Sequence, residues 1–139
     1  MTKDRDLSLD LSPLILVVED DADNQLLLKH TIAMFGWRYI SSMNATDAVT
    51  IAQEKSPDLI LLDIVMPDLN GFQAANLLKN HIQTRSIPLI AVTGLIRSEE
   101  QQLISASGFD DYLSKPYALD DLQRAIVSIL SKRNRCCRL

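Results

Sequence analysis

The chain has 139 residues, of which 47% are hydrophobic, 23% charged and 5% aromatic. This length and balance predict one compact domain that buries its core without metal or disulfide support. The longest stretch without a charged residue, Ser86 to Ile96, spans eleven residues, whereas a membrane helix needs about 20 apolar residues. The first residues mix acids and bases, unlike a secretory signal. We therefore expect a cytoplasmic protein without a membrane segment.

The net charge of −4 is unevenly distributed. The last eight residues hold four cations and no acid, so residues 1–131 carry a charge of −8. An acidic body repels polyphosphate, so we expect no direct DNA binding and regard a divalent cation as the more natural ligand. Cys136 and Cys137 are adjacent and cannot build a disulfide framework, which fits a reducing compartment.

Five short apolar or mixed runs alternate with five segments of helical periodicity. The predicted strands are 14–18, 38–41, 58–62, 88–92 and 110–114, and the predicted helices are 22–35, 45–55, 71–79, 98–107 and 119–132. The first, third and fourth runs are almost wholly apolar, as in parallel strands covered on both faces, and the mixed runs belong at the edges. The alternation predicts an α/β, flavodoxin-like, doubly wound five-stranded parallel sheet of order 2-1-3-4-5 with five helices.

Helical spacing also predicts which faces are buried. The expected core positions are Leu27, Thr31 and Met34 in the first helix, Leu103 and Ala106 in the fourth, and Leu122, Ile126 and Ile129 in the last. Asp23 is the expected N-cap of the first helix, and Gly36 its end.

One domain accounts for most of the chain. Residues 1–13 form a polar arm, residues 14–131 the domain, and residues 132–139 a basic tail. The two ends leave no room for a DNA-binding or catalytic output domain, so we expect output by association with other proteins. For the tail we expect a solvated end, with contact to an acidic partner or homodimer formation as the alternatives.

Charged and polar residues follow four of the predicted strands. Glu19, Asp20 and Asp21 follow the first run, Asp63 follows the third, Thr93 follows the fourth and Lys115 follows the fifth. The carboxyl ends of parallel strands share one edge, where such folds bind ligands. Clustered carboxylates repel each other and raise their own pKa values, so a cation must offset them. Hard oxygen ligands near a phosphate suit Mg²⁺.

The same set suits phosphoryl transfer. Asp63 is the candidate nucleophile, and the Lys115 ammonium and Thr93 hydroxyl are candidates to neutralise phosphoryl oxygens. For any single acid, helix capping is the simpler interpretation. Complementary groups at four successive strand ends favour a reactive site.

Four segments, LILVVEDDADN, LLDIVMPDLNG, IAVTG and YLSKPY, resemble the receiver domain of two-component response regulators, the chemotaxis-type regulators included. The likeness runs from Leu14 to Leu130. It implies a phosphoacceptor at Asp63, phosphate contacts from Thr93 and Lys115, and a magnesium site formed by Asp20 directly, Glu19 through water and the Val65 backbone carbonyl.

The resemblance also implies a switch and an output surface. Tyr112 matches an aromatic residue that turns inward as the Thr93 hydroxyl moves to the phosphoryl group, and Lys115–Pro116 matches a cis peptide. The expected output face comprises 97–107, 110–113 and 119–130. The implied donor is a sensor histidine kinase or a phosphotransfer protein, and the only catalysis expected is of the chain's own phosphorylation and dephosphorylation.

Two further expectations concern the lifetime of the phosphate and the stability of the site. Val65 and Leu95 are apolar where the family borders the path of the hydrolytic water, so we expect slow dephosphorylation, with mere local packing as the alternative. Replacing Asp20 by Asn should raise the melting temperature without metal and weaken Mg²⁺ binding.

Three rival functions differ in class. A receiver-shaped docking module acting without phosphorylation is disfavoured by the complete set of Asp20, Asp63, Thr93 and Lys115. A flavodoxin-like cofactor binder would need a Gly-, Ser- or Thr-rich loop where the acids follow the first strand. A haloacid-dehalogenase-type phosphatase would need an Asp at Val65. His30 and His81 are not expected to relay phosphate, and Trp37 is expected to pack.

Overall fold

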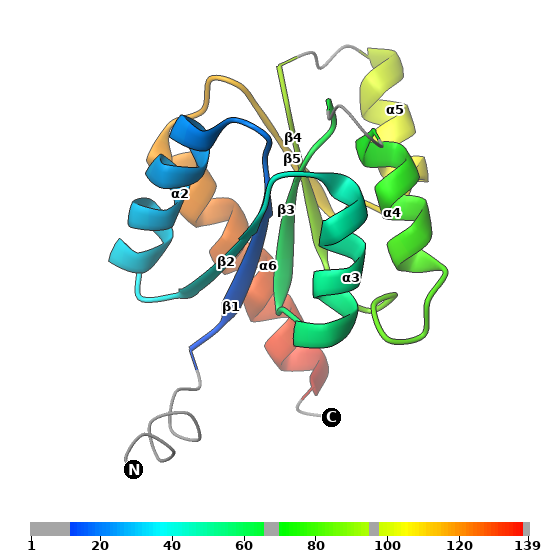
Figure 1. Ribbon diagram of the computed structural model, residues 1–139, viewed down its shortest axis with the longest axis horizontal. Helices are drawn as coiled ribbons and strands as arrows, with labels where there is room; N and C mark the ends of the chain where they lie inside the picture. The colour runs from blue at the N-terminus through cyan, green and yellow to red at the C-terminus, as the bar shows by residue number, and fades with distance from the viewer. Residues whose placement is uncertain (1–11, 66–69, 95–97, 138–139) are drawn as a thin grey trace.

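The computed structural model describes residues 12–65, 70–94 and 98–137. Strands and helices alternate along the chain (Figure 1), and their bounds are β1 (Leu14–Val18), α2 (Ala22–Met34), β2 (Arg38–Ser42), α3 (Ala45–Lys55), β3 (Leu59–Asp63), α4 (Gly71–Lys79), β4 (Leu89–Thr93), α5 (Ser98–Ala106), β5 (Asp111–Ser114) and α6 (Leu119–Cys137). All four strand pairings are parallel, and the order is β2-β1-β3-β4-β5. The predicted fold class and strand order are confirmed.

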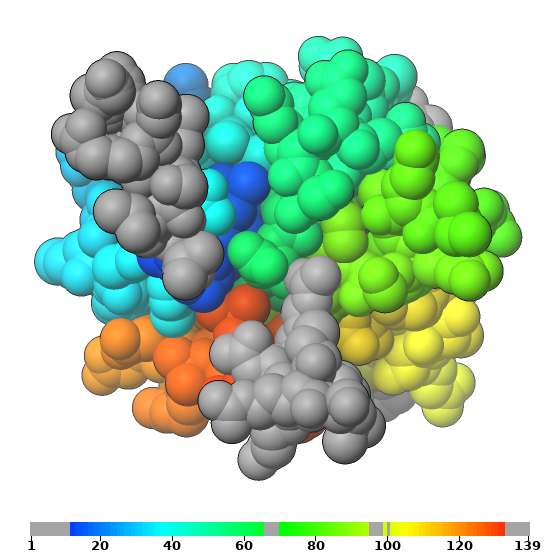
Figure 2. All heavy atoms as spheres, turned by 90° about the horizontal axis from the view of Figure 1, so that it is seen from below, coloured from blue at the N-terminus to red at the C-terminus, as the bar shows by residue number. Residues whose placement is uncertain are grey.

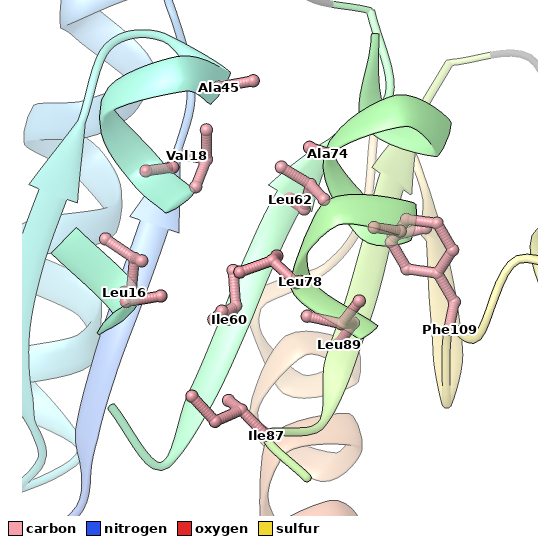
Figure 3. Close-up of a cluster of buried hydrophobic side chains, with 14 of the residues drawn as sticks. Leu16, Val18, Ala45, Ile60, Leu62, Ala74, Leu78, Ile87, Leu89 and Phe109 are labelled. Atoms are coloured by element: carbon pink, nitrogen blue, oxygen red, sulfur yellow. The ribbon is translucent and has the colours of Figure 1, made fainter. Parts of the chain in front are cut away.

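The central strands are buried on both faces. Leu16, Ile60 and Leu62 point toward the layer of α3, α4 and α5, as Figure 3 shows for the side chains between the strands and the helices. The alternate residues, such as Ile15 and Leu61, point toward α2 and α6. Two apolar faces on each strand explain why these runs carry almost no polar residue.

The edge strands and the two ends of the sheet orient the molecule. β2 and β5 are the edges, and both mix exposed and buried residues as predicted. The strands run upward in Figure 1, so the loops after their carboxyl ends lie at the top. Figure 2 views the opposite end from below, with the dark blue residues of the chain's first strand between cyan and green segments.

The buried face of α2 differs from the prediction. Thr31 is buried as predicted, but Leu27 and Met34 are 54% and 71% exposed, and Gln25, Leu28 and Ile32 are buried instead. The buried polar residues have hydrogen-bond partners: the Thr31 hydroxyl donates to the Leu27 carbonyl at 2.8 Å, and the Gln25 amide donates to three carbonyls. Polar residues with partners are buried at little cost. The N-cap is Asp21, whose carboxylate accepts the Asp23 N–H, so the prediction of Asp23 as the cap is wrong.

The predicted buried positions are wrong for α5 and confirmed for α6. In α5 Ile104 is buried and Leu103 and Ala106 are exposed, so the predicted stripe is shifted by one residue. In α6 Leu122, Ile126 and Ile129 are buried as predicted. α6 ends at Cys137, whereas the predicted helix ends at residue 132.

Two smaller features complete the fold. Trp37 packs edge-on against Phe35 with ring centroids 5.4 Å apart, which fits the packing role expected for it. Among the described residues, no helix is both long enough and apolar enough to cross a bilayer.

Candidate functional site

Three carboxylates meet at the carboxyl end of the sheet. Glu19 and Asp20 follow β1, and Asp63 is the last residue of β3. One carboxylate oxygen from each lies within 4.8 Å of the others. Glu19 and Asp63 are 4% and 6% exposed, whereas Asp20 is exposed to solvent. The structure therefore brings the predicted acids together, with two of them buried and one at the rim.

Lys115 bridges the two buried acids. Its Nζ donates to Glu19 Oε1 and to Asp63 Oδ2, both at 3.1 Å. Burial by itself lowers the pKa of the ammonium, but the two hydrogen-bonded carboxylates together outweigh burial and raise the pKa above its ordinary value. Lys115 therefore carries a positive charge at neutral pH, as the prediction required.

Burial disfavours the negative charge of Glu19. Burial raises the pKa of its carboxyl group, although the Lys115 ammonium and the Asp21 N–H hydrogen-bond to it and lower the pKa. The Asp63 charge adds to the increase. Repulsion between acids, the cause expected from the sequence, is thus the smaller contribution to the raised pKa, and desolvation is the larger one.

The loop after β3 holds Asp63 from the other side. The Val65 N–H donates to Asp63 Oδ1 at 3.0 Å, so each Asp63 oxygen has one donor. The Val65 side chain is 67% exposed. Its expected role as a metal ligand through its carbonyl stays a prediction, and Leu95 lies outside the described residues.

Gly71, the last residue of the LLDIVMPDLNG segment, has no role predicted from the sequence, and it keeps this loop close to α4. The Gly71 N–H donates to the Ile64 carbonyl at 2.7 Å. A Cβ at Gly71 would lie 2.7 Å from Ile64 Cα and 3.1 Å from the Asp63 carbonyl oxygen. The sequence alone does not reveal this close approach, because it depends on how the loop after β3 folds back onto the start of α4.

Thr93 and Lys115 are joined through the backbone. Thr93 ends β4 and is 3% exposed, and its carbonyl accepts the Lys115 N–H at 2.8 Å. The Lys115–Pro116 peptide is cis, as predicted. The structure thus places the hydroxyl-bearing residue and the ammonium-bearing residue on neighbouring strand ends.

Tyr112 stands apart from this group. It lies on β5, paired in register with Ala91, and is 37% exposed. Its role as a switch residue stays a prediction. The expected output segments correspond to α5, β5 and α6, except that residues 95–97 lie outside the described part of the chain.

The donor set fits a hard divalent cation. Three carboxylates within reach of one another offer the oxygen ligands that Mg²⁺ takes in small number while keeping several waters. A surface hollow of about 370 Å³ opens beside them, and its lining includes Glu19, Asn24, Leu27, Lys115 and Tyr117. The site is therefore reachable from solvent between α2 and the loop that leads to α6.

Comparisons with known proteins agree with this geometry. Residues 15–127 match the response regulator receiver domain family. The polar-differentiation response regulator DivK of Brucella anthropi is 34% identical over 116 residues, which cover 84% of this chain and 94% of that protein. Protein PilH of Pseudomonas aeruginosa is 34% identical over 117 residues, covering 84% of this chain and 97% of that protein.

Solved structures show the same architecture. The receiver domain of the sensor histidine kinase PA1611 from Pseudomonas aeruginosa has a magnesium ion coordinated in its active site cleft; it aligns with a TM-score of 0.80 at 28% identity, covering 86% of this chain and 98% of that one. The Vibrio cholerae chemotaxis protein CheY4 aligns with a TM-score of 0.81 at 23% identity, covering 85% of this chain and 98% of that one, which supports the fold alone.

Proposed function

Since the chain belongs to the response regulator receiver domain family, we propose that it accepts a phosphoryl group on Asp63 and signals by phosphorylation-dependent contact with another protein. The donor is a phosphohistidine on a sensor histidine kinase or a phosphotransfer protein. The observation that carries the proposal is the Lys115 ammonium, which lies 3.1 Å from both Glu19 and Asp63, two nearly buried carboxylates beside Asp20.

The transfer itself uses Asp63 as the nucleophile. A carboxylate oxygen of Asp63 attacks phosphorus, the bond between phosphorus and the donor imidazole nitrogen breaks, and that nitrogen keeps the bonding electron pair. The Lys115 ammonium and the Thr93 hydroxyl then contact phosphoryl oxygens, so that charge is neutralised as it develops. The protein needs no other covalent chemistry, and its catalysis is limited to its own side chain.

Magnesium fits the same site. Glu19, Asp20, Asp63 and the Val65 carbonyl would hold the ion, which when bound supplies the positive charge that lets a phosphoryl group approach three acids.

Phosphorylation would redistribute the contacts of Lys115. An acyl phosphate adds about −1.5 to −2 charges and three acceptor oxygens, so Lys115 gains a stronger partner than Glu19. A Thr93 hydroxyl drawn toward the phosphate would alter the end of β4, beside Tyr112 on β5. We place the output on α5, β5 and α6 because these elements adjoin the two strand ends that would change.

The partners follow from charge and family. The acidic body, with a charge of −8 over residues 1–131, favours a protein partner over DNA. A cytoplasmic location is part of the proposal, because the kinase and the output partner must both reach the domain, and homodimer formation stays a prediction.

The deciding experiment is chemical phosphorylation. Incubation with acetyl phosphate and Mg²⁺ should add the mass of one phosphate to the wild-type protein and none to Asp63→Asn, as read by intact mass spectrometry. Omission of Mg²⁺ should abolish the gain. A wild-type mass that never changes would instead support a docking module that acts without phosphorylation.

A further inference from the structure

Gln25 is a buried polar residue that the proposed chemistry does not use. It lies in the first turns of α2 and is 7% exposed. Its Nε2 donates to the carbonyl of Val17 at 3.1 Å, of Glu19 at 3.1 Å and of Ser42 at 2.8 Å. An amide nitrogen has two hydrogen atoms, so three acceptors crowd around one group. Few side chains reach the backbone of three separate positions at once.

Tyr39 fixes the direction of this amide. Its hydroxyl contacts Gln25 Oε1 and lies 3.1 Å from the Gln25 carbonyl oxygen. Because Oε1 accepts from the hydroxyl, Nε2 must face the strand ends. Tyr39 belongs to β2 and lines, with Gln25 and Lys29, a surface hollow of about 390 Å³ between α2 and β2.

The three carbonyls belong to the backbone that carries the acids. Val17 is in β1, Glu19 is the buried acid itself, and Ser42 ends β2. The Ser42 carbonyl also accepts the Glu19 N–H at 3.1 Å. Gln25 therefore ties the segment that bears Glu19 and Asp20 to the end of the edge strand, from the side opposite Asp63.

We propose that Gln25, held by Tyr39, is a positioning residue that sets the backbone of Glu19 and Asp20 for metal binding. The charges of Glu19 and Asp63 repel each other, and the Gln25 amide holds the backbone that carries Glu19 by donating to the Glu19 carbonyl. This inference rests on the proposed metal-binding function. According to this proposal, metal binding depends on a residue that is not itself a ligand and that lies where α2 meets β2.

The test replaces Gln25 by Met, which keeps the length of the side chain and removes its donors. We expect the Mg²⁺ dissociation constant, measured by calorimetry with MgCl₂ alone, to rise about tenfold, the lower end of the loss seen when groups that orient metal ligands are removed. Amide hydrogen exchange of residues 19–24 in the metal-free protein should become faster. Tyr39→Phe should have a smaller effect in the same direction.

Thr84→Val is the matched control. Thr84 is 0% exposed and its hydroxyl donates to the Leu78 carbonyl at 2.6 Å, far from the acids. It should lower stability in urea as Gln25→Met does, but leave the Mg²⁺ dissociation constant and the exchange of residues 19–24 unchanged. The double variant Gln25→Met with Tyr39→Phe should bind Mg²⁺ no more weakly than Gln25→Met, because Tyr39 acts through Gln25.

Three results would overturn the proposal. These are a Gln25→Met protein that binds Mg²⁺ like Thr84→Val, additive losses in the double variant, and unchanged exchange of residues 19–24. If the wild-type protein binds no Mg²⁺, the proposed metal site fails, and the exchange measurement still decides whether Gln25 positions the acidic segment. If Gln25→Met does not fold, Tyr39→Phe, which loses one partly buried oxygen, decides by the same two measurements.

Discussion

Acidic residues stand at both ends of the parallel sheet, with different partners. At the amino end, Asp58 and Asp110 each precede a strand and form the same pair of bonds. The Asp58 carboxylate accepts the Leu14 N–H at 2.8 Å while its own N–H donates to the Leu14 carbonyl, also at 2.8 Å. Asp110 does the same with Leu89, at 2.9 and 2.8 Å.

At the carboxyl end the acids face each other instead. Glu19, Asp20 and Asp63 share one site, and Lys115 supplies the positive charge between the two buried members. Acids that are dispersed and bonded to neutral N–H groups stabilise a sheet end, whereas acids gathered in one place raise its energy until a cation offsets them. The role of an acid in this sheet therefore depends on whether it lies at the amino or the carboxyl end of the strands, and not on whether it is Asp or Glu.

Among the variants that test the difference between the two sheet ends, Lys115→Met should lower the free energy of unfolding most. It leaves Glu19 and Asp63 without their cation, and breaking a largely buried ion pair costs about 3–5 kcal/mol, so for this partly exposed lysine we expect about 2–3 kcal/mol at pH 7 without metal. The loss should shrink in acid, where both carboxyl groups take up protons. Urea unfolding at several pH values measures it.

Lys79→Met is the control for Lys115. The Lys79 Nζ donates to two neutral carbonyls, of Arg85 and Ile87, and burial lowers the pKa of this ammonium despite the nearby Asp110. The substitution should cost less and leave Mg²⁺ affinity unchanged. If the two substitutions lowered the free energy of unfolding equally and with the same pH dependence, the proposed difference between the two sheet ends would be wrong.

Gly71→Ala should rank next, because it acts on the backbone of the site. The added Cβ would meet Ile64 Cα at 2.7 Å, and overpacking of this kind costs about 1–3 kcal/mol. Movement of the Asp63 segment should also slow phosphorylation by acetyl phosphate. Gly94 follows Thr93 at the same end of the sheet, and a Cβ there would meet nothing within 4 Å. Gly94→Ala is therefore the control, and it should neither lower stability nor slow phosphorylation.

The amino end should respond in stability alone. Asp58→Ala removes the acceptor of the Leu14 N–H and should cost about 1–2 kcal/mol, the usual effect of losing a hydrogen bond that leaves a partly buried donor. Mg²⁺ affinity and phosphorylation should match the wild type. A change in either would mean that the two ends are coupled, and the comparison would have to be abandoned.

These contrasts also show what the sequence can and cannot predict. Strand order and the meeting of Glu19, Asp20, Asp63 and Lys115 follow from apolar runs and from the residues after them, because parallel topology brings strand ends together. The cis peptide is predicted from the family resemblance alone. The buried face of α2 does not follow. Its residues 26–28 and 32–34 are all apolar and permit several orientations, and the buried face includes Gln25, whose amide reaches three backbone carbonyls that only the folded chain brings together.

The dependence of stability on pH in the acid range should be a smaller effect, and its sign follows from the pKa of Glu19. Burial raises the pKa of Glu19, so the folded protein holds this proton more tightly than the unfolded chain does. Without metal, stability should therefore fall as the pH rises from about the ordinary value of 4.5 through the higher folded pKa. Glu19→Gln should flatten this slope in thermal unfolding, and Mg²⁺ should reverse it by binding the ionised form.

Asp20→Asn tests whether the pH dependence of stability comes from the burial of Glu19 or from repulsion among the clustered acids. Asp20 is exposed, so its substitution should raise the metal-free melting temperature only slightly and leave the slope in place, while weakening Mg²⁺ binding. A lower melting temperature in the metal-free Asn variant would contradict repulsion among the acids. A flattened slope would mean that crowding, rather than the burial of Glu19, controls the pH dependence.

Val65→Asn should have the smallest effect, because it changes a side chain beside the site and no contact within it. The Val65 side chain is 67% exposed while its N–H holds Asp63. An apolar group there cannot orient an attacking water, so an amide should speed loss of the phosphate several-fold without changing stability. Decay of the phosphorylated mass after removal of acetyl phosphate measures the rate.

Val65→Leu is the control, since it stays apolar and keeps the backbone N–H. Its decay should match the wild type, and so should the rate at which either variant is phosphorylated, because the Val65 N–H that holds Asp63 is unchanged. Leu95→Glu tests the second apolar position from the sequence in the same way. If Val65→Asn, alone and combined with Leu95→Glu, decays at the wild-type rate, the two side chains serve only local packing, and the lifetime of the phosphate is set by Asp63, Thr93 and Lys115.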